Sequence, residues 1–262
     1  MLPRFTANIG FLFPERPFLE RIDAAKAAGF AQVECHYPYE VAVDTLRERL
    51  SAAGVELTGL NTAPGDLAAG DFGLAGVPGR ETEFRRAFDQ ALSYAVGLGT
   101  PMIHVMAGVV APNDRQTALR TYISNVRAAA QASAGTGITL LLEPINHRDK
   151  PNYLVSRSDQ MAEIIREIDQ SNVRMLFDAY HVGVQEGDVL ERVVRHQDII
   201  AHVQIAAVPS RAEPDEGDVD YGRFFEVLDT IGYRGLVGLE YKPRGRTEDG
   251  LGWMRELLGR TD

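Results

Sequence analysis

Cysteine is almost absent from this chain, which contains a single one, Cys35. One cysteine cannot form an internal disulfide, so we expect a reducing, cytoplasmic setting and a structural role for Cys35. The first residues, MLPRFTANIGFLF, do not combine a basic segment, a long apolar run and a small-residue cleavage site. No stretch approaches the roughly 20 consecutive apolar residues of a membrane-spanning helix. We therefore expect no membrane partner.

Basic residues are in the minority, with 27 Lys and Arg against 37 Asp and Glu and a formal net charge of −10. Because binding to nucleic acid phosphates needs a basic surface, this balance argues against a nucleic acid partner and favours a small molecule. Phosphate-binding glycine loops of the forms GxGxxG and GxxxxGK[ST] are also missing. A doubly wound open α/β sheet usually carries such a loop after an early strand, so their absence disfavours that fold.

The composition that remains is that of a folded globular protein. Hydrophobic residues make up 45% of the 262 residues and charged residues 24%. Neither a composition break nor a Pro/Ser-rich linker divides the chain, so we expect one domain over residues 1–262. An α/β barrel commonly takes about 250 residues as a single domain.

Short apolar runs rich in β-branched residues alternate with longer stretches of helical periodicity. The expected strands are Phe5–Gly10, Gln32–Tyr37, Glu56–Asn61, Met102–Met106, Ile138–Glu143, Val173–Asp178, Ile200–Ile205 and Leu236–Tyr241. The expected helices are Phe18–Ala28, Val41–Ala53, Glu81–Leu98, Gln116–Ala134, Ser158–Asp169, Val189–Val194, Tyr221–Ile231 and Glu248–Leu258. Eight such units predict a single (β/α)8 TIM barrel. The Gly/Ala/Pro-rich segment 63–79 is expected to be an active-site loop.

Polar residues end four of the apolar runs in the second half of the chain. Glu143, Asp178, Gln204 and Glu240 follow one another at intervals of about one strand-plus-helix unit, so they should meet at the carboxyl-end rim of the barrel. Three carboxylates on one rim repel one another unless a cation offsets their charge. An all-oxygen ligand set suits Mg²⁺ or Mn²⁺ better than Zn²⁺. The alternative is that each residue caps a strand or pairs with a basic side chain.

Four further residues are candidates for binding substrate. His181 lies near the exit of the sixth strand and can donate a hydrogen bond to a substrate oxygen, although a supporting role in a loop is the alternative. Lys242 and Arg211 can neutralise a substrate carboxylate, unless they are ordinary surface cations. His147 is a weaker candidate.

Two other polar residues are ambiguous between the site and the scaffold. His104, among apolar neighbours in MIHVM, is as consistent with a hydrogen-bonded core histidine as with a substrate contact. Glu34 ends the second strand, where it can orient a ligand or form an ion pair at the rim.

These residues sit in stretches that resemble the hydroxypyruvate isomerase family, within the xylose-isomerase-like TIM barrels. The stretches are EPINH at 143–147, FDAYH at 177–181, HVQIA at 202–206 and GLEYKP at 238–243. The resemblance covers almost the whole chain and implies interconversion of hydroxypyruvate and tartronate semialdehyde, with Glu143 and Glu240 transferring protons. It also implies a divalent ion held by Glu143, Asp178, Gln204 and Glu240. Related epimerases carry His where this chain has Gln204.

The chemistry of such an isomerase suits the residues independently. Moving a carbonyl to the neighbouring carbon requires removal of a carbon-bound proton, an enediolate, and return of a proton to the other carbon. Two carboxylates can do this, while a divalent ion stabilises the charge on the two oxygens. A 2-oxo-tetronate isomerase or a ketose 3-epimerase would use the same residues.

Two alternative functions use a different chemistry. An apurinic endonuclease would need a His-rich cluster of several metals and a basic groove. A non-catalytic binding barrel would not need two strand-end glutamates beside an Asp and a Gln. Self-association into a homo-oligomer is compatible with the barrel, but no motif specifies it.

Overall fold

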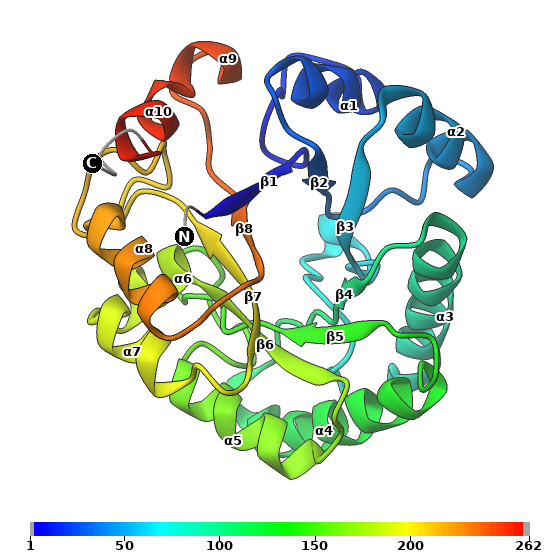
Figure 1. Cartoon of the computed structure of the whole chain (residues 1–262). Helices are drawn as coiled ribbons and strands as arrows, with labels where there is room; N and C mark the ends of the chain where they lie inside the picture. Colours follow the sequence, from blue (N-terminus) through cyan, green and yellow to red (C-terminus); the bar gives the residue numbers. More distant parts are fainter. Residues whose placement is uncertain (1–2, 259–262) are drawn as a thin grey trace.

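The computed structural model describes residues 3–258, and their strands form one closed parallel sheet with helices around its outside (Figure 1). The strands are β1 (Arg4–Asn8), β2 (Gln32–Glu34), β3 (Glu56–Asn61), β4 (Met102–His104), β5 (Thr139–Leu142), β6 (Val173–Asp178), β7 (Ile200–Ile205) and β8 (Leu236–Leu239). They pair in chain order, and β8 closes the ring by pairing with β1. The predicted eight-stranded barrel is confirmed.

The helices follow the expected alternation. They are α1 (Phe18–Ala27), α2 (Val43–Ala53), η1 (Leu67–Ala69), α3 (Glu81–Leu98), η2 (Pro112–Asp114), α4 (Arg115–Ala132), α5 (Ser158–Ile168), α6 (Ala179–Gln185), α7 (Val189–Arg195), α8 (Tyr221–Thr230), α9 (Thr247–Gly250) and α10 (Gly252–Leu258), with η marking 3-10 turns. Gly54 and Gly99 end α2 and α3 in the left-handed conformation, which glycine adopts without strain. The expected last helix is in fact two segments, α9 and α10.

One helix was not predicted. The short α6 begins directly after β6, where Asp178 accepts a hydrogen bond from the Tyr180 backbone N–H at 2.8 Å and so caps it. The same aspartate therefore ends a strand and starts a helix.

Several strands end earlier than predicted. The paired part of β5 stops at Leu142 and that of β8 at Leu239, so Glu143 and Glu240 are the first residues beyond their strands. The predicted strand Leu236–Tyr241 therefore ends two residues early, and Lys242 lies in the loop that follows β8.

The register of the sheet sets the polar residues side by side. Asp178 on β6 lies opposite Gln204 on β7, and Gln204 lies opposite Gly238 on β8. On the other side of β8, the β1 residue Asn8 is paired in register with Glu34 of β2. Parallel pairing thus gathers side chains from distant parts of the chain at one end of the barrel.

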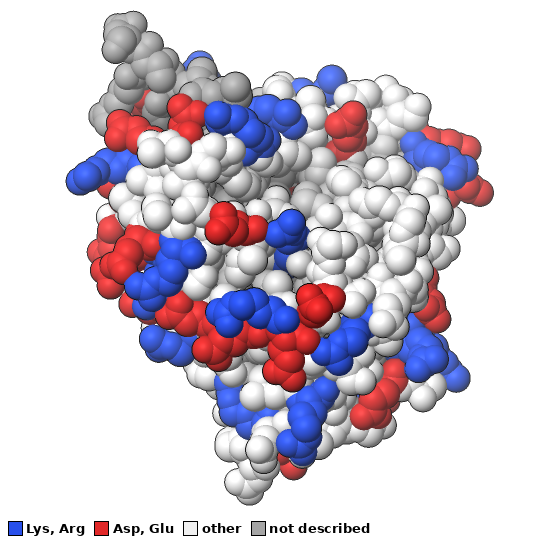
Figure 2. Space-filling model, turned by 60° about the horizontal axis from the view of Figure 1, so that its bottom comes forward, with Lys and Arg blue, Asp and Glu red and all other residues white. Residues whose placement is uncertain are grey.

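The surface carries both signs of charge. Figure 2 shows Lys and Arg intermingled with Asp and Glu on the face that it presents, rather than one continuous basic area. Among the helices of residues 3–258, none is long and apolar enough to cross a membrane.

Candidate active site

A cavity of about 410 Å³ opens at the carboxyl ends of the strands. Its charged and polar wall includes Glu143, Asp149, Lys150, His181, Gln204, Arg211, Glu240 and Lys242. Leu67 and Phe72, from the segment 63–79, also line it, so this segment reaches the site as expected of an active-site loop. The size lies within the range of small-molecule sites, which commonly enclose about 300–1,000 Å³.

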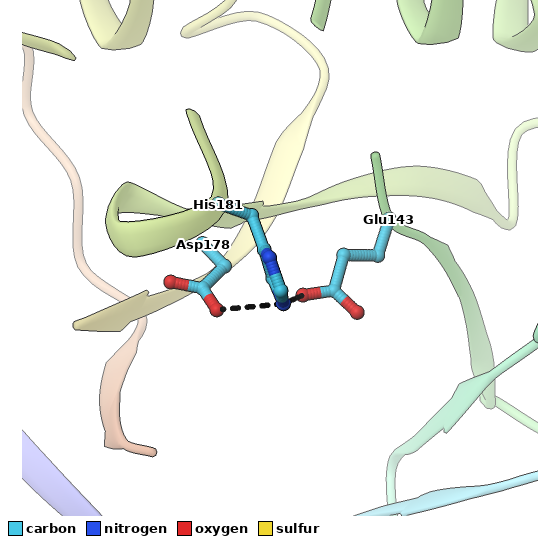
Figure 3. Close-up of side chains that lie close together, drawn as sticks. All are labelled: Glu143, Asp178 and His181. Carbon is cyan, nitrogen blue, oxygen red and sulfur yellow. Dashed lines mark ion pairs between the residues drawn. The ribbon is translucent and has the colours of Figure 1, made fainter. Parts of the chain in front are cut away.

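Glu143, Asp178 and His181 form the closest group of potential metal ligands (Figure 3). The Nε2 atom of His181 lies 3.7 Å from Oδ2 of Asp178 and 4.0 Å from Oε1 of Glu143. All three residues are buried, and one atom from each lies within 4.8 Å of the others. Figure 3 shows the ring of His181 standing between the two carboxyl groups.

Three buried oxygens in this region have no hydrogen-bond partner within the described part of the chain. They are Oε1 of Glu143, Oδ2 of Asp178 and Oε1 of Gln204. Buried acceptors without a partner cost free energy, so such atoms mark places where a ligand or ion completes the structure. All three are hard oxygen donors, the type that Mg²⁺ and Mn²⁺ prefer. The residues present therefore fit a divalent cation.

The amide of Gln204 is held in one orientation. Its Nε2 donates to Oε1 of Glu34 and to Oε2 of Glu240, both at 2.7 Å. Both N–H groups are thereby used, and the carbonyl oxygen is left as the free acceptor. Glu34 is fixed in turn by a 2.7 Å contact with His202 Nε2 and a 3.2 Å hydrogen bond from Asn8. Glu34 thus supports the site from below rather than pairing at the rim.

Gly238 makes this arrangement possible by having no side chain. A Cβ at this position would lie 2.5 Å from Oε1 of Glu34 and 2.8 Å from Cγ of Gln204. Real Cβ contacts are essentially never below 3.0 Å, so both side chains would have to move.

Glu240 is surrounded by donors. Its Oε1 accepts from Arg211 at 2.7 Å, and its Oε2 accepts from Asn8 at 2.9 Å as well as from Gln204. Burial alone would raise the pKa of Glu240, but the hydrogen bond and charge of His36 and the charge of Arg211 outweigh burial and lower it to about 2. Glu240 is therefore ionised at neutral pH.

Glu143 has the opposite electrostatic environment. Burial, reinforced by the charges of Glu240 and Asp178, raises its pKa well above the ordinary value. Burial and the charge of Glu240 likewise raise the pKa of Asp178 to about 7. His104 lies 3.6 Å from Oε2 of Glu143, and burial lowers the pKa of this histidine to about 4, so it brings no positive charge at neutral pH.

His181 is held as a neutral hydrogen-bond donor. Its Nδ1 faces two N–H donors of Asn146, the backbone at 3.3 Å and the side chain at 2.6 Å. Nδ1 must therefore be the acceptor, which leaves the proton on Nε2, the atom that faces Glu143 and Asp178. Burial lowers the pKa of His181 to about 3. A protonated Nε2 does not bind a metal, so the geometry favours a donor role for His181.

The structure brings Arg211 and Lys242 to the cavity wall. The guanidinium of Arg211 lies between the rings of Phe11 and Tyr180, 4.7 and 4.8 Å from their centroids, and pairs with Glu240. Lys242 is exposed, and its backbone N–H donates to the Arg211 carbonyl at 2.8 Å. These two predicted residues are thus neighbours through their backbones.

His147 is placed elsewhere. Its Nε2 lies 2.9 Å from the Tyr153 carbonyl, its backbone N–H donates to Gln185, and it is not among the described residues that line the cavity. Sequence analysis missed several polar residues that do line it, among them His36, Asp149 and Lys150. Asp149 and Lys150 lie two and three residues beyond the motif EPINH, and His36 lies two residues beyond Glu34.

Comparisons with known proteins identify the relatives of this barrel. A family model described as xylose isomerase-like TIM barrel matches residues 22–257. The 2-oxo-tetronate isomerase of Cupriavidus necator is 47% identical over 99% of this chain and 100% of its own. The hydroxypyruvate isomerase of Escherichia coli K12 is 37% identical over 96% of this chain and 98% of its own. A crystal structure of a Brucella melitensis protein named AP endonuclease, family 2, superimposes with a TM-score of 0.95 at 41% identity, covering 97% of this chain and 99% of that one.

Proposed function

Because the chain belongs to the xylose isomerase-like TIM barrel family, we propose that it is an intramolecular isomerase of short 2-oxo acids. The family resemblance carried by the strand-end motifs is confirmed, and relatives matching nearly the whole chain are named isomerases of this kind. The first candidate reaction is the interconversion of hydroxypyruvate and tartronate semialdehyde. Both compounds are small enough for the cavity.

One observation carries the proposal, namely that Glu143 and Glu240 line the same cavity, in surroundings that displace their pKa values in opposite directions. Such a pair is the pattern expected of a general base and a general acid. In this assignment the carboxylate of Glu240 accepts the proton from C3 of hydroxypyruvate, and Glu143 returns a proton to C2. The hydroxyl proton moves from O3 to O2, so atoms and charge balance. The roles exchange in the reverse direction.

The donor set at the rim fits a divalent ion, Mg²⁺ or Mn²⁺, and Glu143, Asp178, Gln204 and Glu240 would hold it. Such an ion, when bound, supplies charge that stabilises the two oxygens of an enediolate. Of the four residues Glu240 is the least free, because both of its oxygens already accept hydrogen bonds. In this proposal His181 donates from Nε2 to a substrate oxygen, while Arg211 and Lys242 attract the substrate carboxylate.

A four-carbon substrate is the second candidate. The Cupriavidus necator relative, with 47% identity, is named 2-oxo-tetronate isomerase. Moving a carbonyl between C2 and C3 of a four-carbon acid needs the same proton transfers. A cavity of about 410 Å³ has room for either acid.

A nuclease is not proposed, despite the name of the Brucella melitensis protein. Within residues 3–258 the His, Cys, Asp and Glu side chains form one group that could hold a metal, Glu143 with Asp178 and His181, rather than a His-rich cluster for several metals. A net charge of −10 does not favour the basic groove that DNA binding needs, and the face in Figure 2 carries both signs of charge intermingled.

Turnover of hydroxypyruvate and of a 2-oxo-tetronate tests the proposal, with each reaction followed before and after chelation. We expect conversion of at least one acid, loss of activity on chelation, recovery with Mg²⁺ or Mn²⁺, and solvent deuterium in the product. The larger kcat/KM identifies the preferred chain length. Turnover of neither acid by metal-loaded protein would overturn the proposal. Product without solvent deuterium would show that the proton is transferred within the active site without exchanging with water.

A further inference from the structure

Lysine is rare in this chain. It has 24 arginines but three lysines, Lys26, Lys150 and Lys242. Lys26 lies on α1 and donates to the Gly54 carbonyl at 3.2 Å, away from the cavity. Both of the other lysines line the cavity. The placement of two of the three lysines at one cavity points to a role for them in that cavity.

The cations of the cavity differ in what they already bind. Arg211 is committed to Glu240 at 2.7 Å and to Asp149 at 3.4 Å. Asp149 is itself occupied, because it also accepts from the hydroxyl of Tyr180 at 2.7 Å. The ammonium of Lys150, by contrast, forms no ion pair with any residue in the described range 3–258. It is a positive charge available to a ligand.

Lys150 is also held in place. Its backbone N–H donates to the Asn146 carbonyl at 3.1 Å, and its carbonyl accepts from the Tyr153 N–H at 3.2 Å. The turn that begins with Asn146, which orients His181, therefore ends with Lys150. Both contacts fix the backbone of this lysine relative to the donor in the site.

The ammonium group rests on an aromatic ring from another part of the chain. It lies 4.0 Å from the centroid of Phe72, on the loop 63–79. That ring packs edge-on at 6.2 Å against Tyr153, which is fully buried and whose oxygen accepts from the Ala107 N–H. A cation held over a ring keeps its charge and its donors while losing little freedom on binding.

We propose that Lys150 is a specificity-determining residue that binds the carboxylate of the substrate, with Phe72 pre-positioning its ammonium group. This inference rests on the proposed function, because it presumes an anionic 2-oxo acid in the cavity. A charge-assisted hydrogen bond to the carboxylate is made equally before and during the reaction, so it lowers KM and leaves kcat nearly unchanged. Exposed Lys242 also lines the cavity and would approach the same anion from the loop after β8.

The test compares the wild type with K150M, K150R and K26M, the last as a matched lysine outside the cavity. K150M should raise KM for hydroxypyruvate about tenfold or more while kcat stays within about threefold, since uniform binding is lost. The inhibition constant of glycolate, a carboxylate that cannot isomerise, should rise in parallel. K150R should recover most of both values, and K26M should match the wild type.

An unchanged KM and glycolate inhibition constant in K150M, or a loss of kcat without a change in KM, would overturn the proposal. If the wild type converts neither oxo acid, the proposed function fails, and calorimetric titration with hydroxypyruvate still decides on Lys150. Equal affinities of the wild type and K150M in that titration, or no binding by the wild type, would also overturn it.

Discussion

Glu143 and Glu240 follow strands β5 and β8 of the same barrel, but they differ in how many of their oxygens have hydrogen-bond partners. We call the surroundings of Glu240, where both oxygens have partners, the complete side, and those of Glu143 and Asp178 the incomplete side. Around Glu240, donors from β1, β7 and the Arg211 loop satisfy both oxygens. Beside Glu143 and Asp178, one buried oxygen of each has no partner among the described residues. On the complete side the donors fix the carboxylate of Glu240 in one position, whereas the incomplete side leaves acceptors for an ion.

The largest effect should come from removing either glutamate's ability to exchange a proton. E143Q and E240Q keep the size of the side chain, and each should lower turnover by about 100-fold or more. Steady-state rates at saturating substrate and metal measure this. Near-wild-type turnover in either variant would remove that residue from the mechanism and break the assignment of two roles.

Asp178 tests the incomplete side directly. D178A removes the unpartnered Oδ2 together with the oxygen that caps α6, so it should abolish tight Mn²⁺ binding while the eight-stranded barrel stays folded. Calorimetric titration of chelator-treated protein measures the affinity, with circular dichroism as the control for folding. Wild-type Mn²⁺ affinity in D178A would show that the unpartnered oxygens are not a cation site.

Glu34 belongs to the complete side through the Gln204 amide, which donates to both Glu34 and Glu240. E34Q disturbs the partner that turns the Gln204 amide, so Mn²⁺ affinity should fall by about 10- to 100-fold, as is usual when a group that orients a ligand is lost. The same titration measures it, and K26M serves as the control. An affinity equal to that of the wild type would mean that Gln204 keeps its orientation without Glu34.

The smallest effect is a pair of opposite shifts in thermal stability in the presence of chelator. Glu240 has a folded-state pKa below that of the unfolded chain, so it adds stability above about pH 4.5 that is lost as pH falls towards 2. Glu143 has a folded-state pKa above that of the unfolded chain. At pH 7 it therefore lowers the free energy of unfolding relative to a neutral side chain of the same size. E240Q should therefore lower Tm at pH 7 and E143Q should raise it, each by about 2 °C or more.

At pH 4 the gain of E143Q should disappear, because both states of the wild type then hold the proton. Thermal unfolding of the wild type and both variants at pH 7 and pH 4 gives the comparison. Shifts of the same sign at pH 7 would mean that the two glutamates do not differ in the way their surroundings indicate.

The barrel could be predicted from sequence because apolar runs and helical periodicity depend on local residues. Three strands, β3, β6 and β7, match their predicted bounds, and the four rim residues were found because each ends an apolar run. The turn after β5 could not be predicted in the same way. His147 and Lys150 are three positions apart in it. His147 is held by Tyr153 and Gln185 and Lys150 by the Asn146 carbonyl, and these contacts are not visible in the local sequence pattern.

Glu34 was ambiguous for a different reason. The sequence pattern of a glutamate at a strand end is the same whether its side chain points to the rim or into the barrel. Its direction follows from three partners on β1 and β7, namely Asn8, His202 and Gln204, which are far away in sequence. Contacts of this range are a property of the closed sheet rather than of any segment.

Gly238 has a consequence for comparing sequences. The site depends on a missing methyl group as much as on its carboxylates, since a single Cβ there would collide with both Glu34 and Gln204. A homologous barrel that keeps all four rim residues but has Ala or Ser at this position should therefore not hold its glutamine in the same way. The position opposite Gln204 on β8 is consequently a better guide to a shared site than the glutamine alone.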